Sequence, residues 1–162
     1  MSRLVWRIAT DTRDYEADDI SGSGASLTGG RWNEVGLPVV YGAENRALAC
    51  LETIVHLNAG GLPLNRYLVE IAIPDALWDA AEIVPPDRLD VGWDALPAAR
   101  PSIRFGSEWI RSRRSALLRV PSVIVPEEIV VLLNPEHPQH ARVRARKIRK
   151  WVYDPRTRSA SS

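Results

Sequence analysis

The chain has 162 residues, a length that fits one compact domain with its own hydrophobic core. Its apolar content of 45% and charged content of 25% are ordinary for a globular protein. The formal net charge of +1 argues against a general polyelectrolyte affinity for nucleic acid, and the single cysteine, Cys50, excludes an internal disulfide. No stretch of the sequence has the character of a transmembrane helix or a signal peptide, so we expect a cytoplasmic protein.

Twelve prolines and ten glycines divide the chain into short elements, which favours a mixed α/β fold over a helical bundle. Runs of β-branched and aromatic residues predict strands, and the acidic, Ser- and Gly-rich stretch at residues 11–26 predicts a loop. The predicted strands cover residues 4–8, 39–41, 67–73, 81–84, 117–126 (two strands with a break), 128–134 and 151–154.

The spacing of apolar residues predicts two helices, at residues 44–57 and 101–114. In the first, Glu52 and His56 are four residues apart and lie on the shoulder of the apolar stripe, where a side chain can face a cleft. The basic stretch at residues 142–150 is interpreted as a solvated terminal helix, with nucleic acid or an acidic partner as the alternative explanation.

The stretch most suggestive of function is Gly29-Gly30-Arg31-Trp32-Asn33, followed by Tyr41 and Glu52. Glycines allow a backbone to come close to a ligand, and a guanidinium is a planar fork of donors that matches phosphate oxygens. An anion-binding group, an aromatic hydroxyl and a carboxylate therefore lie within one strand–turn–helix unit. Taken alone, the same residues also fit a surface turn with a solvated charge.

Other functional patterns are weaker. His137 and His140 lack further residues at metal-ligand spacing, so no metal site is expected. Ser122 with His56 is an isolated hint of nucleophilic catalysis without a local motif.

Several separated segments together resemble the RES-domain family. The matching segments are Gly29 to Asn33, Tyr41, Leu51-Glu52, residues 114–122, Leu133-Asn134-Pro135 with His137-Pro138, and Tyr153-Asp154-Pro155-Arg156. The Arg, Glu and Ser that give this family its name correspond to Arg31, Glu52 and Ser122. The resemblance implies a RES domain at residues 1–155, with residues 156–162 as a disordered tail.

The resemblance also implies a fold and an activity. The fold is a single α/β (α+β) domain with a mixed, split β-sheet like that of ADP-ribosyltransferases. The activity is that of a bacterial toxin that consumes NAD, cleaving the nicotinamide–ribose bond and transferring ADP-ribose to a protein, water or phosphate. The implied partner is a cognate antitoxin of the Xre-like helix-turn-helix type, and a target protein is one of the acceptors.

On this basis Glu52 and Arg31 are expected to be catalytic, and the residues expected to bind NAD are Arg31, Tyr41, His56, Ser122 and Asn134. The alternative is a nucleic-acid-binding or interaction module that uses basic clusters at residues 111–119 and 142–150. The low net charge argues against that alternative.

Overall fold

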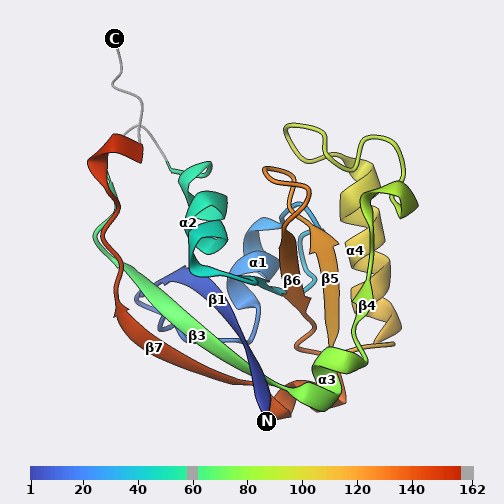
Figure 1. Cartoon of the computed structure of the whole chain (residues 1–162), viewed down its shortest axis with the longest axis horizontal. Helices are drawn as coiled ribbons and strands as arrows, with labels where there is room; N and C mark the ends of the chain where they lie inside the picture. Colours follow the sequence, from blue (N-terminus) through green and yellow to red (C-terminus); the bar gives the residue numbers. More distant parts are fainter. Residues whose placement is uncertain (58–61, 158–162) are drawn as a thin grey trace.

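A seven-stranded sheet forms the centre of the molecule, with strand order β4-β5-β6-β2-β1-β3-β7 (Figure 1). The computed structural model describes residues 1–57 and 62–157. The strands are β1 (Ser2–Thr10), β2 (Val40–Ala43), β3 (Arg66–Pro74), β4 (Glu82–Ile83), β5 (Leu117–Pro121), β6 (Ile129–Leu133) and β7 (Arg144–Lys150). Among the described residues, only β4 and β5 pair in parallel, so the sheet is mixed.

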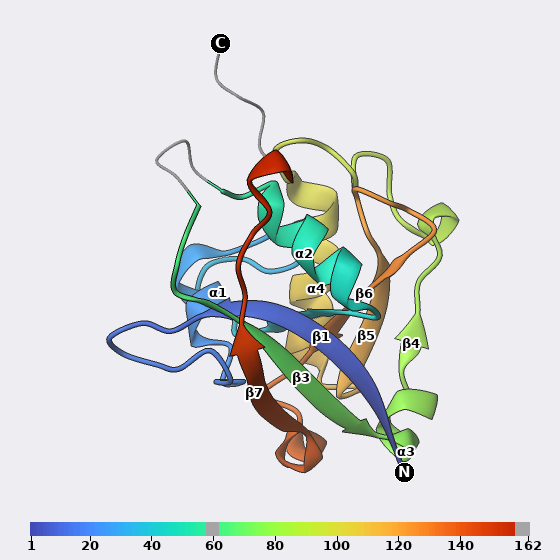
Figure 2. The same cartoon turned by 60° about the vertical axis from the view of Figure 1, so that its left-hand side comes forward.

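The helices lie on both sides of this sheet. The α-helices are α1 (Ser23–Thr28), α2 (Arg46–Ile54), α3 (Asp75–Asp79) and α4 (Arg100–Ser112), and the short 3-10 helices are η1 (Pro86–Arg88), η2 (Pro138–Arg142) and η3 (Pro155–Thr157). Figures 1 and 2 show α2 over the middle of the molecule and α4 over the β5–β6 side.

The sheet is split between β1 and β2. These strands share the single register pair Trp6↔Ala43, whereas β1 pairs with β3 from Ser2↔Pro74 to Thr10↔Arg66. Beyond Trp6 the two halves diverge, with β1, β3 and β7 on one side and β2, β6, β5 and β4 on the other (Figure 2). The predicted α/β fold with a mixed, split sheet is confirmed.

Each half of the sheet has its own apolar packing. Against β1 and β3, α2 buries Leu48 and Ala49, in a cluster that includes Trp6 and Tyr153. On the other half, Trp109 of α4 is fully buried in a second cluster with the strands β5 and β6 and with Trp32. The residue that follows Arg31 is therefore part of a core, which ties the glycine–arginine stretch to α4.

Several predicted elements were wrong in type or extent. The basic residues 142–150 form the strand β7, because pairing with β3 and the contact of Ala145 with the core outweigh local helix propensity. Residues 123–125 and 151–154 are not strands, and α1 begins within the predicted loop at residues 11–26 and extends two residues beyond it. The first predicted helix ends at Ile54, so Val55 is exposed.

The predicted tail falls largely outside the described residues. Of residues 156–162, only Arg156 and Thr157 are described, and both belong to η3. Within the described part of the chain, no helix is both long and apolar enough to cross a membrane. The same residues contain no group of three His, Cys, Asp or Glu side chains arranged to hold a metal ion.

Gly106 of α4 generates a stability prediction, because a Cβ at this position would lie 1.9 Å from the Trp32 carbonyl oxygen. Since the carbonyl oxygen is a backbone atom and the new methyl is fixed to the backbone of α4, Gly106→Ala must push α4 away from the glycine–arginine stretch. We expect a loss of about 3 kcal/mol and a melting temperature lower by roughly 6–12 °C in thermal unfolding. The control is Gly24→Ala, whose methyl meets the movable Tyr15 hydroxyl at 3.1 Å. Equal melting temperatures for Gly106→Ala and wild type would contradict this packing.

Candidate functional site

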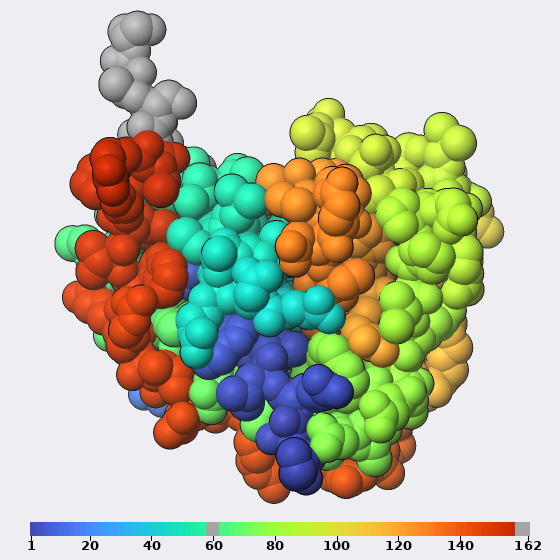
Figure 3. Space-filling model, in the orientation of Figure 1, coloured from blue at the N-terminus to red at the C-terminus, as the bar shows by residue number. Residues whose placement is uncertain are grey.

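Glu52 and Ser122 meet where α2 crosses the end of β5. Glu52 lies in the last turn of α2, and Ser122 follows β5 directly. The Ser122 hydroxyl donates a hydrogen bond to Glu52 Oε1 at 2.6 Å, across a sequence separation of 70 residues. In Figure 3 the loop after β5, in orange, lies against α2, in teal. The fold thus brings together Glu52 and Ser122, two of the three residues that correspond to the Arg, Glu and Ser of the RES-domain name.

The direction of the Ser122 hydroxyl is determined by its backbone neighbours. The Ser122 oxygen accepts hydrogen bonds from the backbone N–H groups of Ile124 at 3.1 Å and Val125 at 3.2 Å. A hydroxyl has two acceptor lone pairs and one proton, so the proton is left to point at Glu52. Ser122 is also 1% exposed and makes no hydrogen bond to His56 within the described residues, which argues against a role as nucleophile.

Arg31 is half-buried beside the loop that precedes α4. Its Nη1 donates to the carbonyl oxygens of Trp93 and Ala95, each at 3.0 Å. Burial lowers the pKa of the Arg31 guanidinium, and the nearby charges of Glu52 and Asp94 oppose this shift. Within the described residues, Nε and Nη2 of Arg31 have no hydrogen-bond partner, so they are the donors left for a ligand.

The backbone around Arg31 is held by Tyr41 and Asn33. The Tyr41 hydroxyl accepts from the Trp32 N–H at 3.1 Å and donates to Asn33 Oδ1 at 2.5 Å. Asn33 is buried, and its Nδ2 donates to the carbonyl oxygens of Ala25 and Leu37. A Cβ on Gly30 would lie 2.7 Å from the Tyr41 hydroxyl, so only glycine fits beside this pair.

These contacts define what Tyr41 does within the chain. Burial raises the pKa of Tyr41 well above its ordinary value, so the phenol stays protonated and can donate to Asn33. Because its hydroxyl is occupied by the Arg31 segment, Tyr41 supports that segment directly. Stacking of the Tyr41 ring on a ligand stays a prediction.

His56 lines a cleft in the split of the sheet rather than a site between Glu52 and Ser122. The cleft has a volume of about 180 Å³ and lies between β1, the end of α2 and Tyr15. Thr53 lines it from α2, His56 from the turn that follows α2, and Arg66 from β3. Glu52 thus reaches toward the β5 half of the sheet, while Thr53 and His56 face the β1 half.

Arg7 is a residue of this cleft that sequence reasoning missed. It lies on β1 immediately after the Trp6↔Ala43 pair, and its Nη1 donates to the Tyr41 carbonyl oxygen across the split at 3.4 Å. Its Nε is buried without a hydrogen-bond partner, and burial lowers the pKa of the guanidinium. Arg7 forms no ion pair within the described residues. The available signal was an arginine inside an otherwise apolar strand at residues 4–8.

Asn134 is not brought to this site. It follows β6 at the end where Leu117 pairs with Leu133, whereas Ser122 lies beyond the opposite end, where Pro121 pairs with Ile129. By the rise of a strand this separation is about 20 Å. Asn134 is fully buried, donates to the Ile110 carbonyl oxygen and accepts from the Glu136 N–H. Its amide therefore joins α4 to the end of β6 and is not available to a ligand there.

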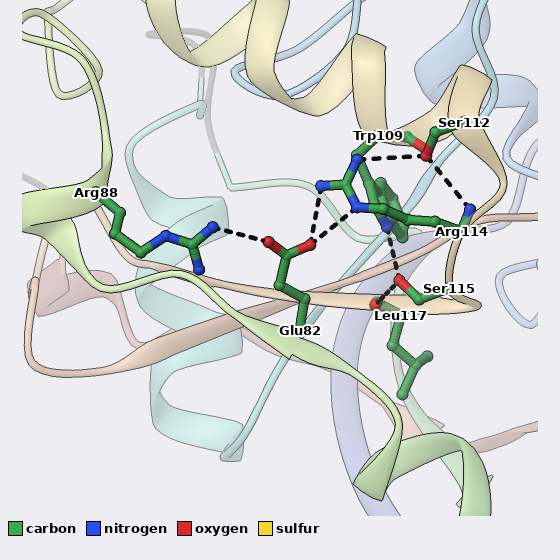
Figure 4. A network of polar contacts seen from close by, with 7 residues as sticks. All are labelled: Glu82, Arg88, Trp109, Ser112, Arg114, Ser115 and Leu117. Atoms are coloured by element: carbon green, nitrogen blue, oxygen red, sulfur yellow. Dashed lines mark hydrogen bonds and ion pairs between the residues drawn. The ribbon is translucent and has the colours of Figure 1, made fainter.

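The basic cluster at the end of α4 is neutralised by carboxylates. Arg111 pairs with Glu34, and Arg113 with Glu136 at 3.6 Å. Arg114 contacts Glu82, which also binds Arg88, in the network drawn in Figure 4. These pairs fasten α4 to β4 and to neighbouring loops, at the end of β5 away from Ser122.

Comparisons with known proteins identify the family and the fold. The RES domain family matches residues 4–155. A Sphingobium sp. (strain YBL2) protein named Prs ADP-ribosylating toxin is 65% identical over 156 residues, which cover 96% of this chain and 97% of that protein. A Photorhabdus laumondii protein named Toxin Res is 42% identical over 115 residues, or 71% of this chain and 72% of that one. A chain in the crystal structure of the M. tuberculosis MbcT–MbcA toxin–antitoxin complex has a TM-score of 0.62 at 16% identity, covering 91% of this chain and 82% of that one.

The Tyr41 hydroxyl yields a prediction about the support of Arg31. Tyr41→Phe removes the acceptor of the Trp32 N–H and the donor to Asn33, so we expect a loss of about 1–3 kcal/mol in the free energy of unfolding. Denaturant unfolding measures the loss, and faster amide exchange at Trp32 locates it. The control is Tyr67→Phe, since the Tyr67 hydroxyl makes no hydrogen bond within the described residues. Unchanged stability of Tyr41→Phe would contradict a supporting role for this hydroxyl.

Proposed function

The chain belongs to the RES-domain family, and from this premise we propose that it is an NAD-consuming toxin that acts in the cytoplasm. The observation that carries the proposal is the Glu52 carboxylate, held by Ser122 at 2.6 Å and lying near the Arg31 guanidinium. Glu52 forms no ion pair within the described residues, so its charge is available to a ligand. The name of the Sphingobium relative, an ADP-ribosylating toxin, supports the same chemistry.

A single held carboxylate suits cleavage of the nicotinamide–ribose bond. Nicotinamide leaves as a neutral molecule, so no acid is needed to protonate it. The barrier instead comes from the positive charge that develops on the ribose, as in glycoside cleavage. Glu52 stabilises this charge electrostatically, and Ser122 fixes the direction of the carboxylate before the substrate arrives.

Cationic side chains account for binding of the pyrophosphate. Arg31 has Nε and Nη2 directed to no protein group in the described chain, which leaves a fork for phosphate oxygens. Arg7 supplies a second positive charge in the split, and Arg66 and His56 line the same cleft. We assign Arg7 to phosphate binding together with Arg31, because its buried Nε has no hydrogen-bond partner and the side chain forms no ion pair in the described part of the chain.

Replacing Glu52 tests the proposal directly. Glu52→Gln keeps the acceptor for Ser122 at nearly constant volume but removes the negative charge, so we expect the fold to persist and NAD turnover to fall by about 10²-fold or more. Nicotinamide release from purified protein is the measurement. The control is Glu127→Gln, an exposed carboxylate in the loop after Ser122. Turnover by Glu52→Gln at the wild-type rate would remove Glu52 from the mechanism.

The same assay identifies the acceptor when it uses NAD labelled in the adenosine part. Transfer to water gives free ADP-ribose, transfer to phosphate gives its phosphate ester, and transfer to protein labels a band in cell lysate. We propose a protein acceptor, on the strength of the Sphingobium relative's name.

We further propose a cognate antitoxin of the Xre-like helix-turn-helix type, since the fold neighbour comes from a toxin–antitoxin complex. An inhibitor of this site must neutralise positive charge. The Arg31 guanidinium is near enough to Glu52 for their charges to interact, and Arg7 and Arg66 line the cleft in the split. An acidic or C-terminal segment of the antitoxin imitates the phosphates of NAD at Arg31.

This occlusion is checked by purifying the chain with the antitoxin from its own operon, with and without the acidic segment. We expect little nicotinamide release from the intact complex and recovery of most activity when the segment is removed. If the truncated antitoxin still binds and inhibits fully, the segment does not occupy the Arg31 site.

A further inference from the structure

The outer edge of β7 carries a dense row of cations that the proposed activity does not use. β7 is the last strand in the sheet order, so its outer edge has no strand partner in the described part of the chain (Figure 2). Its sequence is RARKIRK. An open strand edge presents N–H and C=O groups that can pair with another extended chain.

Three of these cations share one face of the sheet. Arg144, Arg146 and Arg149 stand opposite Ala72, Glu70 and Leu68 of β3, and directly opposite residues of an antiparallel pair point to the same side. Leu68 packs in the cluster that α2 covers, so this is the α2 face, which Figure 3 shows with β7 at its border. We call these three arginines, together with Arg46 at the start of α2, the basic face.

Little negative charge compensates the basic face. Arg146 pairs with Glu70 at 3.1 Å, and Lys147, which points to the other side of the sheet, pairs with Asp11 at 2.9 Å. Arg144 and Arg149 have no carboxylate partner within the described residues. The charges of Arg144 and Arg149 are therefore not neutralised by ion pairs within the described residues.

From this arrangement we infer that β7 is a docking edge for an acidic, extended segment of a protein partner, which adds to the sheet as an eighth strand. Residues two apart in a strand are about 6.7 Å apart along it. Asp or Glu at alternate positions of an added strand have the same repeat as Arg144 and Arg146, while the two backbones exchange hydrogen bonds. Ile148 of β7 is 39% exposed and provides an apolar contact on the same strand.

The observations favour a polypeptide over nucleic acid. Single-stranded nucleic acid gains affinity by stacking bases on open aromatic rings. The two tryptophans nearest the basic face already have arginines over them, with Arg46 3.8 Å from the Trp6 ring centre and Arg149 4.7 Å from that of Trp151. Two copies of β7 would place cations against cations, so repulsion prevents this edge from pairing with itself. The same charges attract an acidic strand.

Fluorescence anisotropy with labelled peptides tests this inference on the full chain. One peptide alternates Glu and Thr, a second alternates Lys and Thr, and a third is the acidic peptide with alternate backbone nitrogens methylated. We expect binding of the first peptide only, salt sensitivity, and a loss of about tenfold or more on N-methylation, because the methylated strand cannot complete the hydrogen-bonded ladder. Equal binding of the methylated and unmethylated acidic peptides would overturn strand addition.

Variants connect the binding to β7. Arg144→Glu/Arg149→Glu should weaken binding of the acidic peptide by about tenfold or more while nicotinamide release stays at the wild-type rate. Arg100→Glu/Arg104→Glu on α4 is the control with the same change of charge, and it should bind the peptide like wild type. Equal losses of peptide affinity in both double variants would overturn the inference. Tighter binding of single-stranded RNA than of the peptide, weakened in the same way by Arg144→Glu/Arg149→Glu, would also overturn it.

Discussion

The hydroxyl of Ser122 has one proton, and the turn after β5 leaves that proton no direction except toward Glu52. Two backbone N–H groups occupy its acceptor sites, and the 2.6 Å bond joins α2 to the β5 half of the sheet. This matters because Glu52 lies in the last turn of α2, where the helix dipole disfavours a carboxylate. The bond, with the nearby Arg31 charge, holds an anion where the helix alone would not favour one. The remaining parts of the site are arranged around this carboxylate.

Support for Arg31 comes from hydrogen bonds and packing within the chain. Gly30 makes room for the Tyr41 hydroxyl, which accepts from the Trp32 N–H and donates to Asn33, whose amide binds the carbonyl oxygens of Ala25 and Leu37. Trp32 in turn packs against α4, where Gly106 allows the two backbones to approach. A guanidinium on a flexible stem loses less entropy on binding a ligand when its backbone is already held. Packing and neutral hydrogen bonds therefore fix the backbone of Gly29 to Asn33, and with it the position of Arg31.

The molecule treats its many arginines in two ways. Those at the end of α4 are paired with Glu34, Glu136 and Glu82 and fasten one element to another. Others, such as Arg7 in the split and Arg144 on β7, have no carboxylate partner in the described part of the chain. A net charge of +1 does not reveal this division, because it sums the 21 basic and 20 acidic side chains without regard to where they lie. Local imbalance of charge, and not the total, indicates where an anionic ligand or partner fits.

By itself, the sequence determined the mixed α/β class, most of the strands, and the family through Arg31, Glu52 and Ser122, because apolar periodicity and short motifs are local properties of the chain. It did not predict β7. The basic residues 142–150 were interpreted as a helix, and their pairing with β3 makes them a strand. The sequence motifs also grouped Asn134 with Ser122. The fold places Asn134 about 20 Å from Ser122 by strand rise. The position of Arg7 in the cleft depends on the divergence of β1 and β2 after one shared pair, which the sequence does not indicate. Strand pairing, register and the point where a sheet splits join residues far apart in the chain, so only the tertiary structure decided them.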